Sequence, residues 1–209
     1  MGHSLSYSFL KFRVISPFAI FPYLHRRFLI LFLVSSVLIL GCALKKEALL
    51  PSEKVARGKV ITRAEFAYLL ATKLNLEGIE KRPKRIIIID ISQNPYRGQI
   101  KKVAKWGIME VYPNHAFLPD KILNRGECAK IVENILVTVK EREKWRRKYL
   151  GKPSPFPDVP TYHRHFNAIM LATKKKTMKP YRDGRFRPGL SLSPGKAKRI
   201  IRRLGRYFK

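Results

Sequence analysis

One pattern constrains this 209-residue chain most: a capped amphipathic helix that occurs three times. Each copy starts at a residue whose side chain can cap a helix, namely Thr62, Asn124 and Ser193. In the first two copies Glu65 and Glu127 follow three positions later, which is the capping-box spacing. Apolar residues then occur four, seven and eight positions after each cap, on one helix face: Phe66, Leu69 and Leu70; Cys128, Ile131 and Val132; Ala197, Ile200 and Ile201. The sequence therefore predicts three copies of one helix.

The repetition extends upstream of the second and third helices. Tyr112–Pro119 is matched 69 positions later by Tyr181–Pro188, and both segments hold a turn pair between aromatic residues. An earlier apolar pattern repeats at the same offset and predicts a first helix in each unit: Ile100, Val103 and Ala104, then Ile169, Ala172 and Thr173. Units of this kind are expected to stack and share one core.

Two insertions interrupt the pattern. Lys81–Ile89 reads KRPKRIIII and predicts a basic loop followed by a buried strand or extended segment. Lys140–Tyr149 is expected to continue the second capped helix as a charged arm, and Pro153 and Pro155 then end it. Trp145 on this arm would rest at a lipid interface or pack on the domain. Cys128 lies on the apolar stripe, where a core role is favoured over a reactive thiol.

The N-terminus has the parts of a secretory signal. Residues 1–27 contain four basic and no acidic residues, and Phe28–Leu40 is apolar apart from two serines. The alternative is an uncleaved membrane anchor, but the apolar run is shorter than the roughly 20 residues that a spanning helix needs. Ile39–Cys42 resembles the bacterial lipobox, which implies cleavage after residue 41 and acylation of Cys42. Several acyl chains would attach the protein permanently to a membrane.

The recurring motifs together resemble S-layer homology (SLH) repeats. The resemblance rests on four segments: Ile61–Phe66, Gly107–Met109, Asp158–Pro160 and Tyr181–Pro188. It implies a mainly α fold in which tandem helix–loop–helix repeats pack as a pseudo-threefold prism, with an incomplete first repeat. In chain order, the expected segments are a signal peptide at 1–41, lipidated Cys42 and tether at 42–54, a partial repeat at 55–80, a second repeat at 86–140, a basic helical arm and linker at 141–155, and a third repeat at 156–209.

The same resemblance implies grooves that bind cell-wall glycans. Carried over by position, it assigns glycan contacts to Arg63, Arg125, Asp90 and Asp158. An arginine fork at a helix start would suit a carboxylate or phosphate on a sugar. The alternatives are that the two arginines face solvent, and that the two aspartates cap the helices that follow them. Ser193–Lys196 lacks the arginine and glutamate of the motif, and the family's His-Trp pair is absent, which removes a stacking surface for a sugar.

Charge restricts the partners that the chain can bind. The net charge is +30, and removing the four basic residues of the leader leaves +26. Such a field favours anionic polymers. Nucleic acid would be the first expectation for a cytoplasmic protein, but export argues against it and favours wall polysaccharide, lipid head groups or lipopolysaccharide. Alternatively, Lys and Arg merely cover the surface. Ala43 after the acylated cysteine would favour the outer membrane in a bacterium with two membranes.

No pattern in the sequence predicts an enzyme, a cofactor or a metal site. Phosphate-binding glycine loops and zinc-spaced cysteines are missing, and His163 and His165 are spaced so that they do not share a helix face. Three hypotheses therefore stay open. The chain is an envelope lipoprotein that binds wall or surface glycan, a lipoprotein that docks another envelope protein, or a generic polyanion binder.

Overall fold

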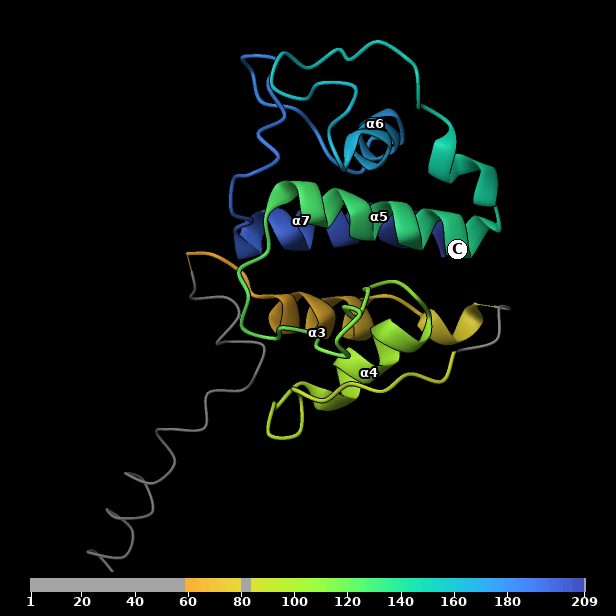
Figure 1. The fold of residues 1–209 in the computed structure, drawn as a ribbon, viewed down its shortest axis with the longest axis vertical. Helices are drawn as coiled ribbons and strands as arrows, with labels where there is room; N and C mark the ends of the chain where they lie inside the picture. Colours follow the sequence, from red (N-terminus) through yellow and green to blue (C-terminus); the bar gives the residue numbers. More distant parts are fainter. Residues whose placement is uncertain (1–58, 80–83, 209) are drawn as a thin grey trace, which may run out of the picture. The chain divides into compact units, whose positions relative to one another are not determined.

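The computed structural model describes residues 59–79 and 84–208, and this part of the chain is mainly helical (Figure 1). The prediction of a mainly α fold is thereby confirmed for these ranges. The expected signal peptide at 1–41 and the expected lipidated Cys42 with its tether at 42–54 lie outside the described residues. None of the helices in the described ranges combines the length and the apolar character needed to cross a bilayer.

Five α-helices and three short 3₁₀ helices are found in the described ranges. The α-helices are α3 (Arg63–Lys73), α4 (Arg97–Lys105), α5 (Arg125–Lys140), α6 (Phe166–Lys174) and α7 (Pro194–Leu204). The 3₁₀ helices are η2 (Leu76–Gly78), η3 (Glu143–Arg147) and η4 (Gly205–Tyr207). Helix α4 packs against α3, α6 packs against α5, and α7 contacts α3.

Side-chain caps start helices α3 and α5. The Glu65 amide donates to Thr62 Oγ1 at 3.2 Å, and Glu65 Oε2 accepts from the Thr62 amide at 2.8 Å. The same reciprocal pair joins Asn124 and Glu127, at 2.8 and 3.2 Å. Both helices therefore begin with a complete capping box, which satisfies amides that lack intrahelical partners.

Helix α7 starts differently. Ser193 occupies its N-cap position with an extended backbone, but its side chain makes no capping hydrogen bond. Pro194 is the first helical residue, where its fixed φ suits the helix and its missing N–H costs nothing. The third copy of the helix thus forms without the capping box of the other two.

The residues just before the three caps are joined in a closed ring of backbone hydrogen bonds. The Ile61 amide donates to Leu192 O at 2.9 Å, the Leu192 amide to Leu123 O at 2.8 Å, and the Leu123 amide to Ile61 O at 2.9 Å. All three side chains are fully buried. The ring brings the starts of α3, α5 and α7 together, and all three helices begin at the same side of the view in Figure 1.

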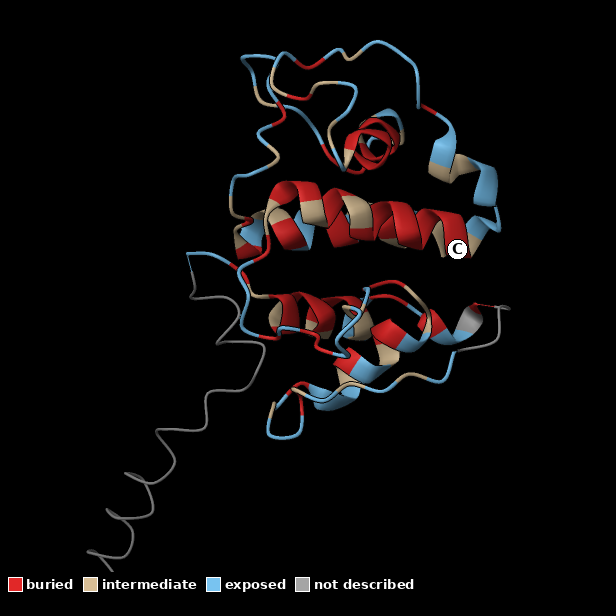
Figure 2. Ribbon diagram, viewed as in Figure 1, coloured by how far each residue is buried: buried red, intermediate tan, exposed pale blue. Residues whose placement is uncertain are grey.

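The apolar stripes of the three capped helices meet in one hydrophobic core. It contains all nine stripe residues named above, together with phenylalanines from the intervening loops, Phe117 and Phe186. Figure 2 shows buried residues along the whole length of α5. Cys128 belongs to this core, and burial raises the pKa of its thiol to about 12, which confirms the expected core role.

The loops around α4 and α6 repeat the same backbone conformations 69 positions apart. Left-handed φ values occur at Gly107 and Lys176, at His115 and Gly184, and at Leu118 and Arg187. For residues with a side chain this conformation costs about 1–2 kcal/mol, so its recurrence at the same offset marks a shared loop fold. The repetition seen in the sequence is therefore also present in the backbone.

The expectation of a buried strand near Lys81–Ile89 is wrong for the part that the structure describes. Residues 84–88 form no regular secondary structure, and the Ile87 and Ile89 side chains are 68% and 64% exposed. The segment is extended, and its amides at Lys84 and Ile89 donate to loop and helix-end carbonyls. An apolar run is buried as a strand only when another strand pairs with it, and the described ranges provide none.

The expected charged arm is not a continuation of α5. The helix ends at Lys140, and Glu141 takes a left-handed conformation with φ 49°. The chain then turns into η3, and Trp145 packs partly buried against the core with Lys175 Nζ 4.3 Å from its ring centre. A left-handed residue ends a helix because the next amides turn back onto its last carbonyls.

Candidate functional site

Arg63 is buried at the start of α3 and binds the loop that precedes α5. Only 6% of the residue is exposed. Its Nε donates to Phe117 O and its Nη2 to Glu110 O, both at 2.8 Å. Its guanidinium carbon also lies 4.6 Å from the centre of the Phe117 ring. Desolvation lowers the pKa of this guanidinium from its ordinary value, and the carbonyl partners offset the cost of burying the charge.

Arg125 repeats this arrangement at the start of α5. It is 4% exposed, and it donates from Nε to Phe186 O at 2.9 Å and from Nη2 to Lys179 O at 3.0 Å. Burial lowers its pKa as well. The alternative in which Arg63 and Arg125 face solvent is therefore wrong, because each guanidinium is inserted into a loop of the following helix pair.

Asp90 and Asp158 hold the same loops from the other side. The Asp90 carboxylate accepts from the Phe117 and Leu118 amides at 2.8 and 2.7 Å. Asp158 accepts from the Phe186 and Arg187 amides at 2.9 and 2.6 Å. Neither aspartate caps the next helix: the N-cap positions of α4 and α6 are Tyr96 and His165, without side-chain caps. The alternative role as helix caps is therefore wrong.

The arginine and the aspartate of each set thus bind the backbone of the same phenylalanine. Arg63 takes the carbonyl of Phe117 and Asp90 takes its amide; Arg125 and Asp158 do the same for Phe186. We call each set an Arg–Phe–Asp clamp. In each set, the candidate arginine and the candidate aspartate bind the same loop. The two sets form two separate sites, so the two arginines do not share one.

A first groove opens beside Arg63. It has a volume of about 130 Å³. Its lining comes from the 110–113 loop, one face of α5 and the start of α6: Arg63, Glu110, Val111, Tyr112, Pro113, Glu127, Lys130, Ile131, Asn134, Arg164 and His165. Burial is the largest influence on the pKa of Glu127 and alone would raise it, but the hydrogen bonds from Lys121 Nζ at 2.6 Å and from the Asn124 amide, together with the charges of Lys121 and Arg63, hold that pKa below its ordinary value. The Glu127 carboxylate in this groove is therefore ionised at neutral pH and paired with Lys121.

A second groove opens beside Arg125, with a volume of about 210 Å³. It is lined by the 178–181 loop and one face of α7: Arg125, Met178, Lys179, Pro180, Tyr181, Lys196, Arg199, Ile200 and Arg203. Seven of these positions lie 69 residues after lining positions of the first groove. The two grooves are therefore equivalent places in successive helix pairs.

The two grooves differ in charge at the equivalent positions. Glu110 and Glu127 of the first are replaced by Lys179 and Lys196 in the second. The second groove consequently has five cationic residues and no acidic one in its lining. Lys196 Nζ donates to Tyr181 Oη at 2.5 Å and lies 4.6 Å from the centre of that ring. Because cationic groups already lie against the Tyr181 ring, this ring is not free to stack on a sugar. The groove therefore interacts with a ligand mainly through its positive charges.

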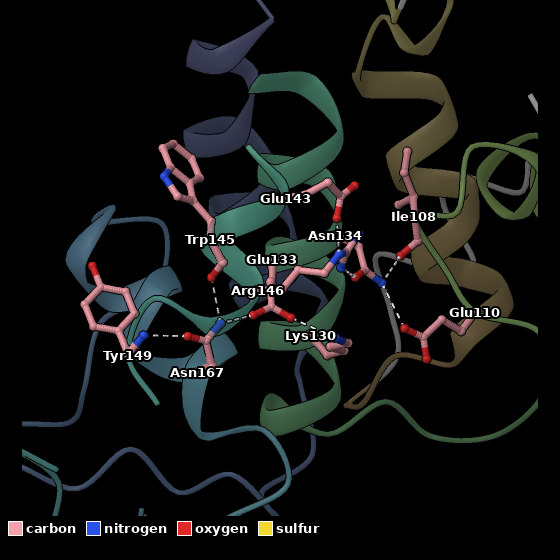
Figure 3. Close-up of polar contacts among 10 residues, drawn as sticks. All are labelled: Ile108, Glu110, Lys130, Glu133, Asn134, Glu143, Trp145, Arg146, Tyr149 and Asn167. Atoms are coloured by element: carbon pink, nitrogen blue, oxygen red, sulfur yellow. Dashed lines mark hydrogen bonds and ion pairs between the residues drawn. The ribbon is translucent and has the colours of Figure 1, made fainter. Parts of the chain in front are cut away.

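A buried polar network fixes the insertion between α5 and α6 (Figure 3). Asn167 Nδ2 donates to Glu133 and to Trp145 O, and Asn167 Oδ1 accepts from the Tyr149 amide at 2.8 Å. Nearby, Arg146 donates to Asn134 Oδ1 at 2.8 Å, so η3 supports a residue that lines the first groove. Sequence reasoning missed this network, although Glu133 and Asn167 are polar residues on inward helix faces.

His163 and His165 lie next to each other just before α6, with ring centres 5.8 Å apart. No group of three or more His, Cys, Asp or Glu residues suited to a metal ion occurs in the described ranges. His163 Nδ1 instead accepts from the His165 amide at 3.1 Å. Desolvation, with Arg164 and His163 adding to it, lowers the pKa of His165 to about 4. His165 therefore lines the first groove as a neutral side chain at neutral pH.

The clamp can be tested at Asp158. Replacing it by alanine (Asp158→Ala) removes the acceptor for two loop amides, one of which belongs to left-handed Arg187. We expect a loss of about 2–3 kcal/mol in the free energy of unfolding, measured by urea denaturation. Asp120→Ala, at an exposed loop position, is the control and should change it by less than about 0.5 kcal/mol. Equal small effects of both changes would contradict the clamp.

The state of His165 predicts a pH effect on stability. An unfolded histidine titrates near pH 6.5, whereas His165 in the fold stays neutral down to about pH 4. Between these values the unfolded chain binds the extra proton, so the fold loses stability as the pH falls from about 6.5 towards 4. Urea titrations at pH 7 and pH 5 give the free energy of unfolding at each pH. Its decrease from pH 7 to pH 5 should be smaller in His165→Gln than in the native chain. An identical loss in both would show that His165 does not contribute.

Comparison with known proteins identifies one segment. Residues 155–193 match the family model of the S-layer homology domain, a segment that runs from before Asp158 through α6 and the Tyr181 loop to Ser193. A search of curated proteins finds no match. SLH domains are non-catalytic binding domains of the cell envelope that generally bind cell-wall glycans. Residues 155–193 are thus similar to an S-layer homology domain, and this segment carries the loop of the second groove.

Proposed function

We propose that the chain is a non-enzymatic envelope lipoprotein whose repeats bind an anionic glycan of the cell wall or cell surface. The observation that carries this proposal is the second groove, where five cations and no acid surround a pocket of about 210 Å³ beside the SLH segment. A carboxylate, pyruvyl ketal or phosphate on a sugar would complement this lining. The clamp residues Arg125 and Asp158 act by positioning the groove wall, and the other four cations of the lining contact the ligand.

The proposed architecture is a pseudo-threefold prism of three repeats. Its boundaries are a partial repeat at 55–80, a second repeat at 86–140 and a third at 156–209, with a linker at 141–155. The ring through Ile61, Leu123 and Leu192 supports it, because each repeat contributes one equivalent backbone group. The equal offset between the linings of the two grooves supports it as well.

The glycan proposal is tested by exchanging charge within the second groove. Lys179→Glu with Lys196→Glu introduces the residue type that the first groove carries at those positions, so the fold should tolerate it. We expect the purified chain to sediment with cell-wall sacculi and the double variant to lose at least about 90% of that binding, because attraction to the anion becomes repulsion.

The matched control reverses two exposed charges outside both grooves, Lys101→Glu with Lys174→Glu. Its net charge equals that of the groove variant, and its binding should stay close to that of the native chain. Equal losses in the two variants would indicate a generic polyanion binder. No binding by the native chain, together with a defined protein partner in pull-downs, would favour the protein-docking alternative.

The membrane attachment is proposed from the sequence of the leader. Acylation at Cys42 after removal of residues 1–41 should be visible as incorporation of labelled palmitate and in the mass of the mature N-terminus. Cys42→Ala should abolish both, whereas Cys128→Ala should keep the label because that thiol is buried in the core. Label retained in Cys42→Ala would contradict the lipoprotein assignment.

A further inference from the structure

A third groove lies between α7 and α3 and has no counterpart of α4 or α6 over it in the described ranges. Its volume is about 600 Å³. We call it the α3–α7 groove and define it by its lining: Leu69, Lys73, Lys198, Arg199, Ile201, Arg202, Gly205 and Arg206. Leu69 and Ile201, which are 4% and 3% exposed, lie beneath its floor, and the basic side chains form its walls with their hydrocarbon stems and charged ends.

The equivalent face of α5 shows what normally covers such a surface. Glu133 on that face is 2% exposed and bonds to Asn167 of α6, and its neighbours Val132 and Leu136 are fully buried. The residue of α7 that lies 69 positions after Glu133 is Arg202, which is exposed. Helix α4 packs in the same way on α3. Two of the three capped helices therefore have a second helix seated against them, and the α7 face has none among the described residues.

The charge of the α3–α7 groove limits what can occupy it. Five basic residues line the groove and no acidic residue does. The segment at 43–58 carries four basic and two acidic residues, and a second copy of the chain carries +30. Both would be repelled by the rim at close range. An occupant that brings acidic residues complements this rim best.

We propose that the α3–α7 groove docks an amphipathic helix of a partner protein, with an apolar stripe flanked by acidic residues. The apolar stripe would lie above Leu69 and Ile201, against the hydrocarbon stems of the basic side chains that form the groove walls. Glutamate or aspartate beside the stripe would pair with Lys198 and Arg202 across the rim. This interaction is separate from glycan binding, because Lys198 and Arg202 do not line the second groove.

The test uses the full chain in nanodiscs of zwitterionic lipid, with empty nanodiscs as the blank. The probe is a fluorescent 16-residue peptide of Leu, Ala and Glu, with leucines on one helix face and glutamates beside them. A scrambled peptide of the same composition has the same charge without the stripe. We expect anisotropy to report binding of the patterned peptide and at least about tenfold weaker binding of the scrambled one.

Two variants locate the binding. Lys198→Glu with Arg202→Glu should weaken binding at least about tenfold, and Lys101→Glu with Lys174→Glu, the charge-matched control, should leave it unchanged. Gly205→Trp should also weaken it without a charge change, because a side chain built at Gly205 meets no atom within 4 Å and would fill the groove. Circular dichroism checks that each variant is folded.

Three outcomes would overturn the proposal. The first is equal binding of patterned and scrambled peptides, and the second is full binding by the folded Gly205→Trp variant. The third is stronger binding of phosphatidylglycerol vesicles than of the patterned peptide, which would assign the groove to lipid. Sacculus binding should persist in Lys198→Glu with Arg202→Glu, so failure here is distinguishable from failure of the glycan proposal.

Discussion

A buried guanidinium inserted into the loop of the next helix pair is the interaction on which the described fold depends. Arg63 and Arg125 are charged groups with almost no solvent contact, and such groups destabilise a fold unless polar partners surround them. Backbone carbonyls provide those partners, and the matching aspartates bind the amides of the same loops. Because each clamp joins a helix start to a loop far along the chain, it fixes successive units and shapes the groove between them.

The periodic features of the sequence predicted the periodic features of the structure. The stripe residues of α3, α5 and α7 share one core, because a cap and an apolar spacing are local properties that tertiary contacts did not override. The prediction of a buried strand at Ile86–Ile89 was wrong because burial of a strand requires a partner strand, which local sequence does not specify. The roles of Asp90 and Asp158 depended on amides from a distant loop, and no local pattern encodes that pairing.

The sequence predicted where the grooves lie, but it did not predict which contacts the candidate residues make. Each of the two arginines lines one groove, but both are buried in its wall. The more accessible side chains of the lining come from the next helix and loop. Lysines at 179 and 196 oppose glutamates at 110 and 127, so two copies of one scaffold present different electrostatic surfaces. The two grooves of one fold therefore suit ligands of different charge.

The hydrogen-bonded ring has a consequence for the order in which the domain assembles. It takes one backbone group from near the beginning of the described chain and another from near its end, Ile61 and Leu192. Helix α3 therefore cannot obtain α7 as a neighbour until the chain has been synthesised past residue 204. Closing such a long loop makes folding slow compared with local helix formation. The ring of the described domain stays open until Leu192 has been made, so the contacts that depend on its closure form only after all three capped helices are available.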